Sequence, residues 1–551
     1  MRERLGGSLA GWLLLIMACL LVGLPILWAT GVALRTANLT GALPIESGPG
    51  IPGATVSGPV AGDSLTFFST ATTLQSFGVA LLIGAIGAGL GWPLAWTLRL
   101  RGWKYLPLVA TPLLLPNYLA FGAFNLLRAP GTWLGDWLEQ SARGESSWIP
   151  VAAGKALAVG ALGLWSAPLG AIVLAAWLQN VDREVLAQAE LDAPKGRVAA
   201  ARANLRFRMG LSWPGLIAAA GLIALIMLGS AIPLHVARLE TLTIRVWLAM
   251  DLLPQERQWR AWIVAWPVVL AAVSAAWVLS GIVARPRSES DETTATKVRS
   301  TGALAGTWCV LILSVVVPAG LFASHIASVG GLAGFTHTYR EQLISSLLLG
   351  LVTGVGASLL MLLAWTASLE RRGKPLVRAS LFLLLISGLV PGVMVGVWIS
   401  GAVRSMSPAL ESTALPLVMA HLARFGMVPV MLGCWMASLE PKAWADQRAI
   451  DGATGVWALV RVSILPRWPV LVAAALVAGI LSFHEIESSI VVQPPGIDTL
   501  ARAILNQLHF ARTQELSCAG LILLGGGLCL GVTALWMIGR LGGPGAPVSR
   551  P

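Results

Sequence analysis

Residues 11–33 read GWLLLIMACLLVGLPILWATGVA, an apolar stretch without a charged side chain. In a helix, about 20 apolar residues are enough to cross the hydrocarbon core of a bilayer. The stretch is also longer than the apolar core of a cleaved signal peptide, which runs about 7–15 residues. We therefore predict that these residues form an uncleaved membrane-spanning helix.

Apolar stretches of similar length recur along the whole chain. They lie near residues 76–98, 106–127, 154–178, 214–234, 261–283, 304–325, 342–367, 379–402, 414–437, 469–492 and 518–539. Hydrophobic residues make up 56% of the 551 residues and charged ones only 12%, whereas soluble domains carry about 25% charged residues. The sequence thus predicts an all-α integral membrane protein with twelve spanning helices, and it excludes disordered, coiled-coil and nucleic-acid-binding classes.

The cysteines show no pattern of a disulfide framework or a zinc site. All five lie in apolar stretches, and none forms a C-x-x-C pair or has a histidine at ligand spacing. We expect them to act as small hydrophobic side chains; they are Cys19, Cys309, Cys434, Cys518 and Cys529.

The positions of Lys and Arg predict how the chain is oriented. With a cytoplasmic N-terminus, the inside segments hold 25 of the 38 basic residues and the outside segments hold 11. The inside segments are 1–10, 99–105, 179–213, 284–303, 368–378, 438–468 and 540–551. Because cytoplasmic loops are enriched in Lys and Arg, both termini are predicted to be cytoplasmic. The net charge of +12 is then a topology and anionic-lipid signal.

The chain divides into two similar halves. Residues 284–303 form a polar, charged linker between 1–283 and 304–551, each of which is predicted to hold six spans. WPGLIAAA from Trp213 matches WPVLVAAA from Trp468, and Gly87-Ala88 with LAW at 94–96 matches Gly356-Ala357 with LAW at 363–365; Pro116 pairs with Pro391. An even number of spans gives parallel repeats rather than inverted ones. Chance similarity between alanine-rich helices is the alternative.

The inside loop 438–468 reads as a helix–turn–helix. Charges lie on one side of 438–450, Asp451-Gly452 is typical of a helix stop because glycine permits positive φ, and a second helix runs to Leu465-Pro466. An ordinary amphipathic loop lying on the lipid headgroups is the alternative.

This loop resembles the EAA loop of ABC-importer permeases. Asp446 stands where the family has Glu, Asp451-Gly452-Ala453 matches the common Asp-Gly-Ala, and Leu465-Pro466 follows one residue late. The resemblance implies a type I ABC importer permease of the fused two-repeat kind, in a bacterial inner membrane. It further implies that the loop docks on a cytoplasmic ABC ATPase dimer and that an extracytoplasmic substrate-binding protein delivers the solute.

The first half keeps a weaker version of the same loop. In AQAELDA at 187–193, Glu190 and Asp192 are the counterparts of the second-half acidic residues, while Ala193 replaces the glycine and Pro194 follows. No Leu-Pro pair occurs before Trp213-Pro214. By resemblance, Glu190 and Asp192 are the first-half candidates for coupling to an ATPase.

The segment after the second loop is similar to that of fused ferric-iron and thiamine permeases. It holds SFHEIESS from Ser482, a Pro-Pro-Gly at 494–496 and Thr499-Leu500, with Glu485 at the place of a family glutamate. The first half retains Glu240-Thr241-Leu242. The resemblance implies import of ferric iron, with thiamine or another small solute as the alternatives.

Five polar side chains fall inside the predicted eleventh and tenth spans. They are His484, Glu485 and Glu487, and His421 and Arg424. Because a charge at the centre of a bilayer costs roughly 2.5–3.5 kcal/mol, these residues mark either a translocation path or structural partners between helices. Conduction requires weak binding, so we expect no tight metal site.

The chain carries no ATP-binding motif of its own. Its two Gly-Lys pairs, Gly154-Lys155-Ala and Gly373-Lys374-Pro, do not fit a P-loop. We therefore predict a transport subunit rather than an enzyme, with no bound cofactor and with ATP used by a partner. The competing prediction is a proton-coupled secondary transporter that uses His484 and Glu485. A lipid-processing enzyme has no nucleophile–base pair to support it.

Overall fold

The computed structural model describes most of the chain. The described residues are 3–41, 70–102, 105–143, 146–192, 194, 196–252, 259–283, 301–326, 330–438, 440, 450, 461, 464–510 and 512–541. Within these ranges the secondary structure is helical and contains no strand. The all-helical class expected from the sequence is confirmed for this part of the chain.

The helices of the first half, in chain order, are α1 (Glu3–Ala18), α2 (Leu24–Gly41), α3 (Thr70–Arg101), α4 (Leu106–Ala110), α5 (Asn117–Asn125), α6 (Trp133–Ala142), α7 (Ile149–Leu178), α8 (Arg183–Leu191), α9 (Arg197–Leu228), α10 (Ile232–Val236), α11 (Leu242–Leu252) and α12 (Trp259–Val283). A π-helical turn, Cys19–Gly23, joins α1 to α2. A 3-10 turn, Thr111–Leu114, extends α4, and a second one, Leu126–Arg128, extends α5.

The helices of the second half are α13 (Thr301–Leu311), α14 (Val317–Ser324), α15 (Gly330–Thr338), α16 (Arg340–Leu369), α17 (Gly373–Leu389), α18 (Gly392–Met406), α19 (Pro408–Glu411), α20 (Leu415–Phe425), α21 (Met427–Ser438), α24 (Trp468–His484), α25 (Ser489–Val492), α26 (Leu500–His509) and α27 (Thr513–Leu541). A π-helical turn, Ile312–Val316, again joins the first two. Helix α13 begins at Thr301, inside the predicted linker, whose residues 284–300 lie outside the described ranges.

Long apolar helices dominate the described chain. Eight of them are long and apolar enough to cross a membrane, or up to 11 if each of three bent pairs counts as one span. Every apolar stretch singled out from the sequence coincides with such a helix, a bent pair or the shorter helix α24. A multi-pass helical membrane protein is therefore confirmed, while the number twelve stays a prediction.

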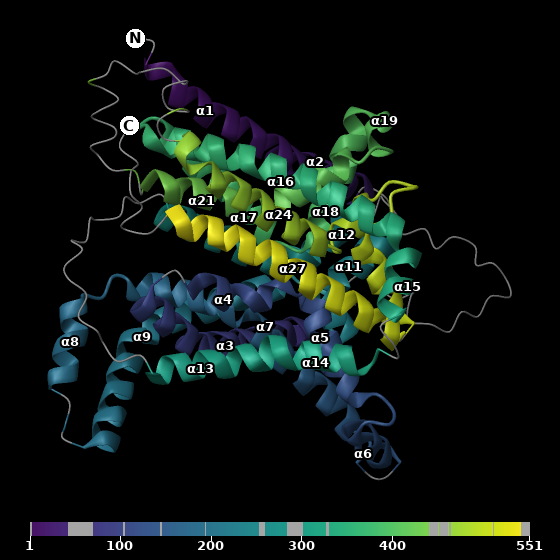
Figure 1. The fold of residues 1–551 in the computed structure, drawn as a ribbon. Coiled ribbons are helices and arrows are strands. Elements are labelled where there is room, and N and C mark those ends of the chain that lie inside the picture. Colours follow the sequence, from purple (N-terminus) through teal and green to yellow (C-terminus); the bar gives the residue numbers. More distant parts are fainter. Residues whose placement is uncertain are drawn as a thin grey trace.

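The helices form a bundle whose two ends carry different connecting elements. Figure 1 shows α8 at the side where α1 begins, and α6, α15 and α19 at the opposite side. The sequence places the start of α1 and α8 inside the cell and the other three outside. The structure thus groups the elements as the predicted topology requires, and which side faces the cytoplasm stays a prediction.

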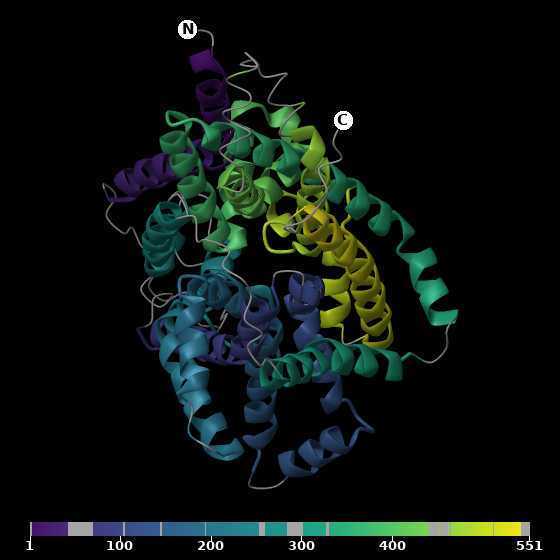
Figure 2. The same ribbon diagram turned by 60° about the vertical axis from the view of Figure 1, so that its left-hand side comes forward.

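The two halves exchange their first helices. Helix α1 packs on α16 and α17 of the second half, and α13 packs on α3 of the first. Helix α12 likewise packs on α17, while α27 contacts both α24 and α4. In Figures 1 and 2 the purple α1 lies among the green second-half helices, and the teal α13 lies against the blue first-half ones. Because each half covers part of the other, neither half buries its apolar surface alone.

Close helix approaches recur in both halves. A Cβ at Gly84 on α3 would lie 2.3 Å from the carbonyl oxygen of Ala220 on α9, and one at Gly354 on α16 would lie 2.6 Å from that of Ala475 on α24. Ala220 and Ala475 end the matching WPGLIAAA and WPVLVAAA stretches. Glycine is needed at both positions because any larger side chain would force the helices apart.

A matching hydrogen bond also recurs in both halves. The backbone N–H of Leu242, which begins α11, donates to Ser76 Oγ on α3 at 2.7 Å. The N–H of Leu500, which begins α26, donates to Ser346 Oγ on α16 at 2.8 Å. Both leucines belong to the Thr-Leu pairs noted in the sequence. The two halves therefore share internal contacts as well as sequence.

Candidate functional site

Two spans that the sequence presents as single helices are bent at proline. Helix α5 follows α4 at Pro116 with a bend of 71°, and α18 follows α17 at Pro391 with a bend of 115°. The residue before each proline, Leu115 or Val390, is extended. Proline disfavours the helical conformation in the residue that precedes it, so the first helix ends there. The predicted spans 106–127 and 379–402 are each broken at this point.

Two further helices end inside the bundle without a proline at the break. Helix α9 stops at Leu228 and the chain resumes as α10 at Ile232, while α24 stops at His484 and resumes as α25 at Ser489. A helix end leaves backbone N–H and C=O groups without intrahelical partners. In an apolar environment these groups require other hydrogen-bond partners.

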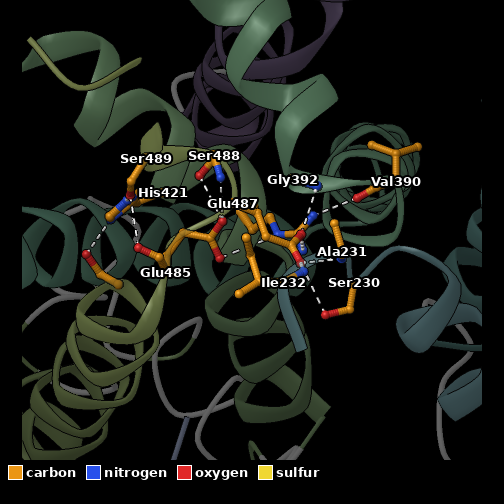
Figure 3. Close-up of polar contacts among 12 residues, drawn as sticks. Ser230, Ala231, Ile232, Val390, Gly392, His421, Glu485, Glu487, Ser488 and Ser489 are labelled. Atoms are coloured by element: carbon orange, nitrogen blue, oxygen red, sulfur yellow. Dashed lines mark hydrogen bonds and ion pairs between the residues drawn. The ribbon is translucent and has the colours of Figure 1, made fainter. Parts of the chain in front are cut away.

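Glu487 lies at the centre of these breaks. Its Oε1 accepts hydrogen bonds from Ser230 Oγ at 3.1 Å, from the N–H of Ala231 at 2.7 Å and from that of Ile232 at 3.4 Å. Its Oε2 accepts from the N–H of Gly392, at the start of α18, at 3.2 Å. Figure 3 shows the carboxylate between Gly392 and the segment Ser230–Ile232. A second-half side chain thus satisfies the broken backbone of the first half.

Arg424, near the end of α20, supplies the positive charge at this centre. Its Nη2 donates to Glu487 Oε2 at 2.9 Å, and its Nη1 donates to the carbonyl oxygen of Val390 at 2.6 Å. Its Nε lies 3.7 Å from Glu485 Oε2. The side chains of Glu485 and Glu487 are buried, and that of Arg424 is 12% exposed. Removing one member of a buried ion pair leaves a charge without compensation, so the arginine is required for this arrangement to persist.

The break between α4 and α5 joins the same network through Asn117. This residue begins α5, and its Nδ2 donates to Ser230 Oγ at 3.3 Å. Trp165 Nε1 donates to the carbonyl oxygen of Leu115 at 2.7 Å and so satisfies the other side of that break. Hydrogen bonds therefore connect these four helix breaks, two from each half, in one buried polar centre.

Glu485 and His421 form the second part of the centre. Glu485 Oε1 accepts from the N–H of Ser488 at 2.9 Å and from its Oγ at 3.0 Å. The His421 ring lies 2.6 Å from Ser482 Oγ through Nδ1 and 2.8 Å from Ser489 Oγ through Nε2. Ser489 Oγ donates to the carbonyl oxygen of Glu485 at 3.0 Å, so its oxygen accepts from His421. The histidine thereby holds α24 and α25 in position.

Of the five intramembrane residues predicted from the sequence, four are brought together. Figure 3 shows Glu485, Glu487 and His421 within one polar network, and Arg424 joins it through its ion pair with Glu487. His484 ends α24 and is half-buried, and among the described residues no hydrogen bond ties it to this network. Within the same residues, no group of three or more His, Cys, Asp or Glu side chains is placed to hold a metal ion.

The predicted ATPase-coupling residues are only partly covered by the structure. Asp446, Asp451, Gly452 and Ala453 lie outside the described residues. Leu465 and Pro466 form a 3-10 turn, Leu465–Arg467, directly before α24, and Leu465 is exposed. Their role in coupling stays a prediction.

The first-half loop does contain a helix–turn–helix. Glu190 lies in α8, and Asp192 follows its last residue and is exposed. The turn into α9 includes Gly196 at φ +115°, a conformation that favours glycine. A glycine with positive φ thus precedes α9, at a later position than Ala193.

The sequence also missed the residues that complete the polar centre. Ser230, Ala231 and Ile232 contribute backbone or hydroxyl donors, and such donors have no signature in the sequence. Tyr118 on α5 is buried, and its hydroxyl has no hydrogen-bond partner among the described residues. The signal that could have found this region is the proline at 116, which marks the neighbouring break.

No protein-family model matches the chain, no curated protein matches it, and no solved structure matches it. What the geometry defines is therefore a class: a multi-pass helical membrane protein with a buried charged centre at the junction of its two halves.

Proposed function

We propose that this chain is the permease subunit of an ATP-driven importer in a bacterial inner membrane. Ferric iron is the first candidate for the solute, with thiamine or another small solute as the alternatives. Two sequence resemblances support the proposal: that of residues 446–466 to an EAA loop, and that of 482–500 to ferric-iron and thiamine permeases. In this proposal a separate ATPase dimer hydrolyses ATP, and an external binding protein delivers the solute.

One structural observation carries the proposal. Each predicted coupling loop is followed directly by a helix that ends at the buried polar centre. Helix α9 begins after Gly196 and runs without interruption to Leu228, next to Ser230. Helix α24 begins after the Leu465–Arg467 turn and runs to His484, next to Glu485.

These two helices give the proposed mechanism a physical route. At 1.5 Å per residue, the 32 residues of α9 span about 48 Å. Because α9 is one continuous helix, displacement of the α8–α9 turn by a closing ATPase would shift Ser230 and Ala231 at its other end. Those residues donate to Glu487. Movement of the two coupling loops would therefore make or break the contact between the halves.

The polar centre is suited to a transport protein. Ionisable side chains within a membrane are costly, and they commonly mark the path of a solute or ion. Discontinuous helices whose ends meet near such charges are also a recurring feature of transporters. In the proposed cycle, breaking the Glu487 contacts to the first half accompanies the change from one open side to the other.

The first experiment tests the partner and the loop together. Cells with and without the gene are assayed for uptake of labelled ferric iron and labelled thiamine, and the tagged chain is purified to identify an ATPase subunit. We expect Gly452→Val to abolish uptake and ATPase co-purification while the protein still reaches the membrane. The matched control is Gly525→Val on α27, where an added Cβ meets nothing within 4 Å; it should retain uptake.

The outcomes separate the candidates. Loss of iron uptake alone supports the ferric proposal, and loss of thiamine uptake alone replaces the solute. Normal uptake by Gly452→Val would contradict the assignment of residues 446–466 as the coupling loop. Uptake by vesicles that contain this chain alone, driven by a proton gradient, would favour the proton-coupled secondary transporter instead.

A further inference from the structure

A row of cations lies on one face of α17, at the end of the bundle where α1 begins. Lys374 and Arg378 are one helical turn apart on α17, and Arg371 lies three residues before Lys374, in the turn that leads into the helix. Residues spaced by three or four in this way share one face. All three side chains are exposed. The start of α17 lies beside α1, since a Cβ at Gly11 would be 3.5 Å from the Cα of Gly373.

These cations are not balanced by the protein. Within the residues that the structure describes, their side chains have neither a carboxylate partner nor a hydrogen-bond partner. The corresponding connection of the first half, 99–105, differs. Arg99 Nη2 donates to the carbonyl oxygen of Val181 at 2.6 Å, and Arg101 Nη1 donates to the Tyr105 hydroxyl at 3.5 Å. The row on α17 therefore has positive charge available for a partner outside the chain.

An aromatic surface adjoins the inner end of this row. The Arg378 guanidinium carbon lies 5.1 Å from the centre of the Trp277 ring on α12, and its Nη2 would lie 3.2 Å from a Cβ at Gly281. The Trp277 ring meets Phe382 edge-on, with ring centres 5.9 Å apart. Phe382 follows Arg378 by one turn of α17, and Trp277 is 62% exposed. The face thus passes from cations to aromatic rings within about two helical turns.

The surface beyond the aromatic rings is apolar and exposed. On α12, Leu270 stands two turns from Trp277 on the same face and is 60% exposed, and Val273 between them is also exposed. Helix α12 packs on α17, so the two helices form one continuous surface. A tryptophan between cations and aliphatic side chains is typical of the boundary between lipid headgroups and acyl chains.

We propose that this α12–α17 face binds an anionic phospholipid. The phosphate lies against Arg371, Lys374 and Arg378, and an acyl chain lies along Trp277 and Leu270. Basic residues at the cytoplasmic surface attract anionic lipids, and the partial positive charge at the N-terminus of α17 acts in the same direction. Because α12 belongs to the first half and α17 to the second, the bound lipid stabilises the contact between the halves. This inference does not depend on the proposed transport function.

The test measures lipid binding to the full chain. The detergent-purified protein is titrated with dioleoyl phosphatidylglycerol, dioleoyl phosphatidylcholine and inorganic phosphate. Bound lipid is counted by native mass spectrometry, and the unfolding temperature is recorded in parallel. Four forms are compared: wild type, Lys374→Gln, the double variant Arg371→Gln/Lys374→Gln, and the control Arg340→Gln. Arg340 is an exposed arginine at the start of α16, and it too has no carboxylate partner in the described part of the chain.

We expect phosphatidylglycerol alone to remain bound and to raise the unfolding temperature of the wild type. Its affinity should fall about fivefold for each cation removed, hence about 25-fold in the double variant, and it should not change in Arg340→Gln. Added sodium chloride should weaken the binding, because salt screens charges at the surface. Before lipid is added, all four forms should unfold at the same temperature, since the substituted side chains are exposed.

Four results would overturn the inference. Equal affinity in the double variant and wild type would show that the row does not bind the lipid. An equal loss in Arg340→Gln would show that net charge, rather than this face, attracts it. Equal effects of phosphatidylcholine or inorganic phosphate would show that a charged head joined to acyl chains is not required. Loss of a co-purified ATPase subunit from the double variant, with phosphatidylglycerol binding unchanged, would assign the row to a protein partner instead.

Discussion

The break between α9 and α10 and the break between α24 and α25 occupy matching places in the two halves, yet they carry different chemistry. The first, at residues 229–231, is Gly-Ser-Ala and offers hydrogen-bond donors. The second, at 485–488, is Glu-Ile-Glu-Ser and offers two carboxylates. The donors of the first break bind the Glu487 carboxylate of the second break. The two halves therefore share their backbone arrangement here, and they differ in a few side chains at the centre.

The largest effect is expected from removing the charge that balances the second break. Arg424→Met leaves Glu485 and Glu487 buried without a guanidinium, and breaking a buried pair in this way costs about 3–5 kcal/mol. The unfolding temperature in nanodiscs should fall sharply. Arg404→Met is the matched control, since Arg404 pairs with Glu411 at an exposed position, where such a change costs about 1 kcal/mol or less.

The variant Glu487→Gln tests the same ion pair by removing its negative member. Arg424 then keeps Glu485 as its remaining carboxylate, so the loss should be smaller than in Arg424→Met. The double variant should lose less than the sum of the two single changes, because the partners are coupled. Strictly additive losses of stability would show that the interaction between Arg424 and Glu487 does not stabilise the fold.

The next effect compares the close helix approaches of the two halves. Gly84→Ala and Gly354→Ala each place a methyl group against a backbone carbonyl oxygen, at 2.3 Å and 2.6 Å, and such overpacking costs about 1–3 kcal/mol. We expect the first to be worse. Gly89→Ala on α3, where an added Cβ meets nothing within 4 Å, should be neutral or stabilising. Similar unfolding temperatures for all three would contradict the packing described for α3 with α9 and α16 with α24.

An effect of similar size, and equal in the two halves, is expected from the shared serine contact. Ser76→Ala and Ser346→Ala each leave one backbone N–H, of Leu242 or Leu500, without its partner. An unsatisfied buried donor costs about 1–3 kcal/mol. Thermal unfolding of both variants should give losses of the same size, with Ser274→Ala on the exposed face of α12 as the control. Clearly unequal losses would mean that the halves do not share this part of the scaffold.

The smallest effect concerns an ion pair outside the centre. Arg404 Nε donates to both carboxylate oxygens of Glu411 at 2.9 Å, and this guanidinium holds the pKa of Glu411 below its ordinary value. A lowered pKa in the folded state means that the pair stabilises the fold at neutral pH and loses that effect as the pH falls through the folded-state pKa. Glu411→Gln should lower the unfolding temperature slightly at pH 7 and not at low pH. A difference that persisted in acid would show that the charge is not its cause.

The sequence predicted the helices better than their interruptions. Proline at 116 and 391 was recognised as a point of similarity between the halves, but the bends of 71° and 115° were not predicted, because proline also occurs within unbroken helices, as at Pro168 in α7. The breaks after Leu228 and His484 have no such marker. The backbone groups freed after Leu228 depend on Glu487, which lies 256 residues from Ala231 in the chain, whereas those freed after His484 pair with the nearby side chains of Glu485 and Ser489.

Only part of the polar centre could be predicted from the sequence. A charged residue in an apolar stretch stands out in any sequence, so Glu485, Glu487, Arg424 and His421 were found. Tyr118 was not, because a tyrosine in a membrane helix gives no signal in the sequence, and only the fold shows that its hydroxyl has no partner within the part of the chain that the structure describes. Glycine with positive φ at 196 was likewise visible only in the folded backbone.

From the sequence alone, the membrane helices and the few costly charges among them could be predicted, because apolar length and charge are local properties of a chain; the similarity of the two halves was predicted from matching motifs. The folded chain adds that Glu487 satisfies the broken backbone of the other half, that Arg424 lies closer to Glu487 than to Glu485, and that the Tyr118 hydroxyl has no hydrogen-bond partner among the described residues. Those facts are distances between residues far apart in the chain, and packing of the two halves against each other sets them.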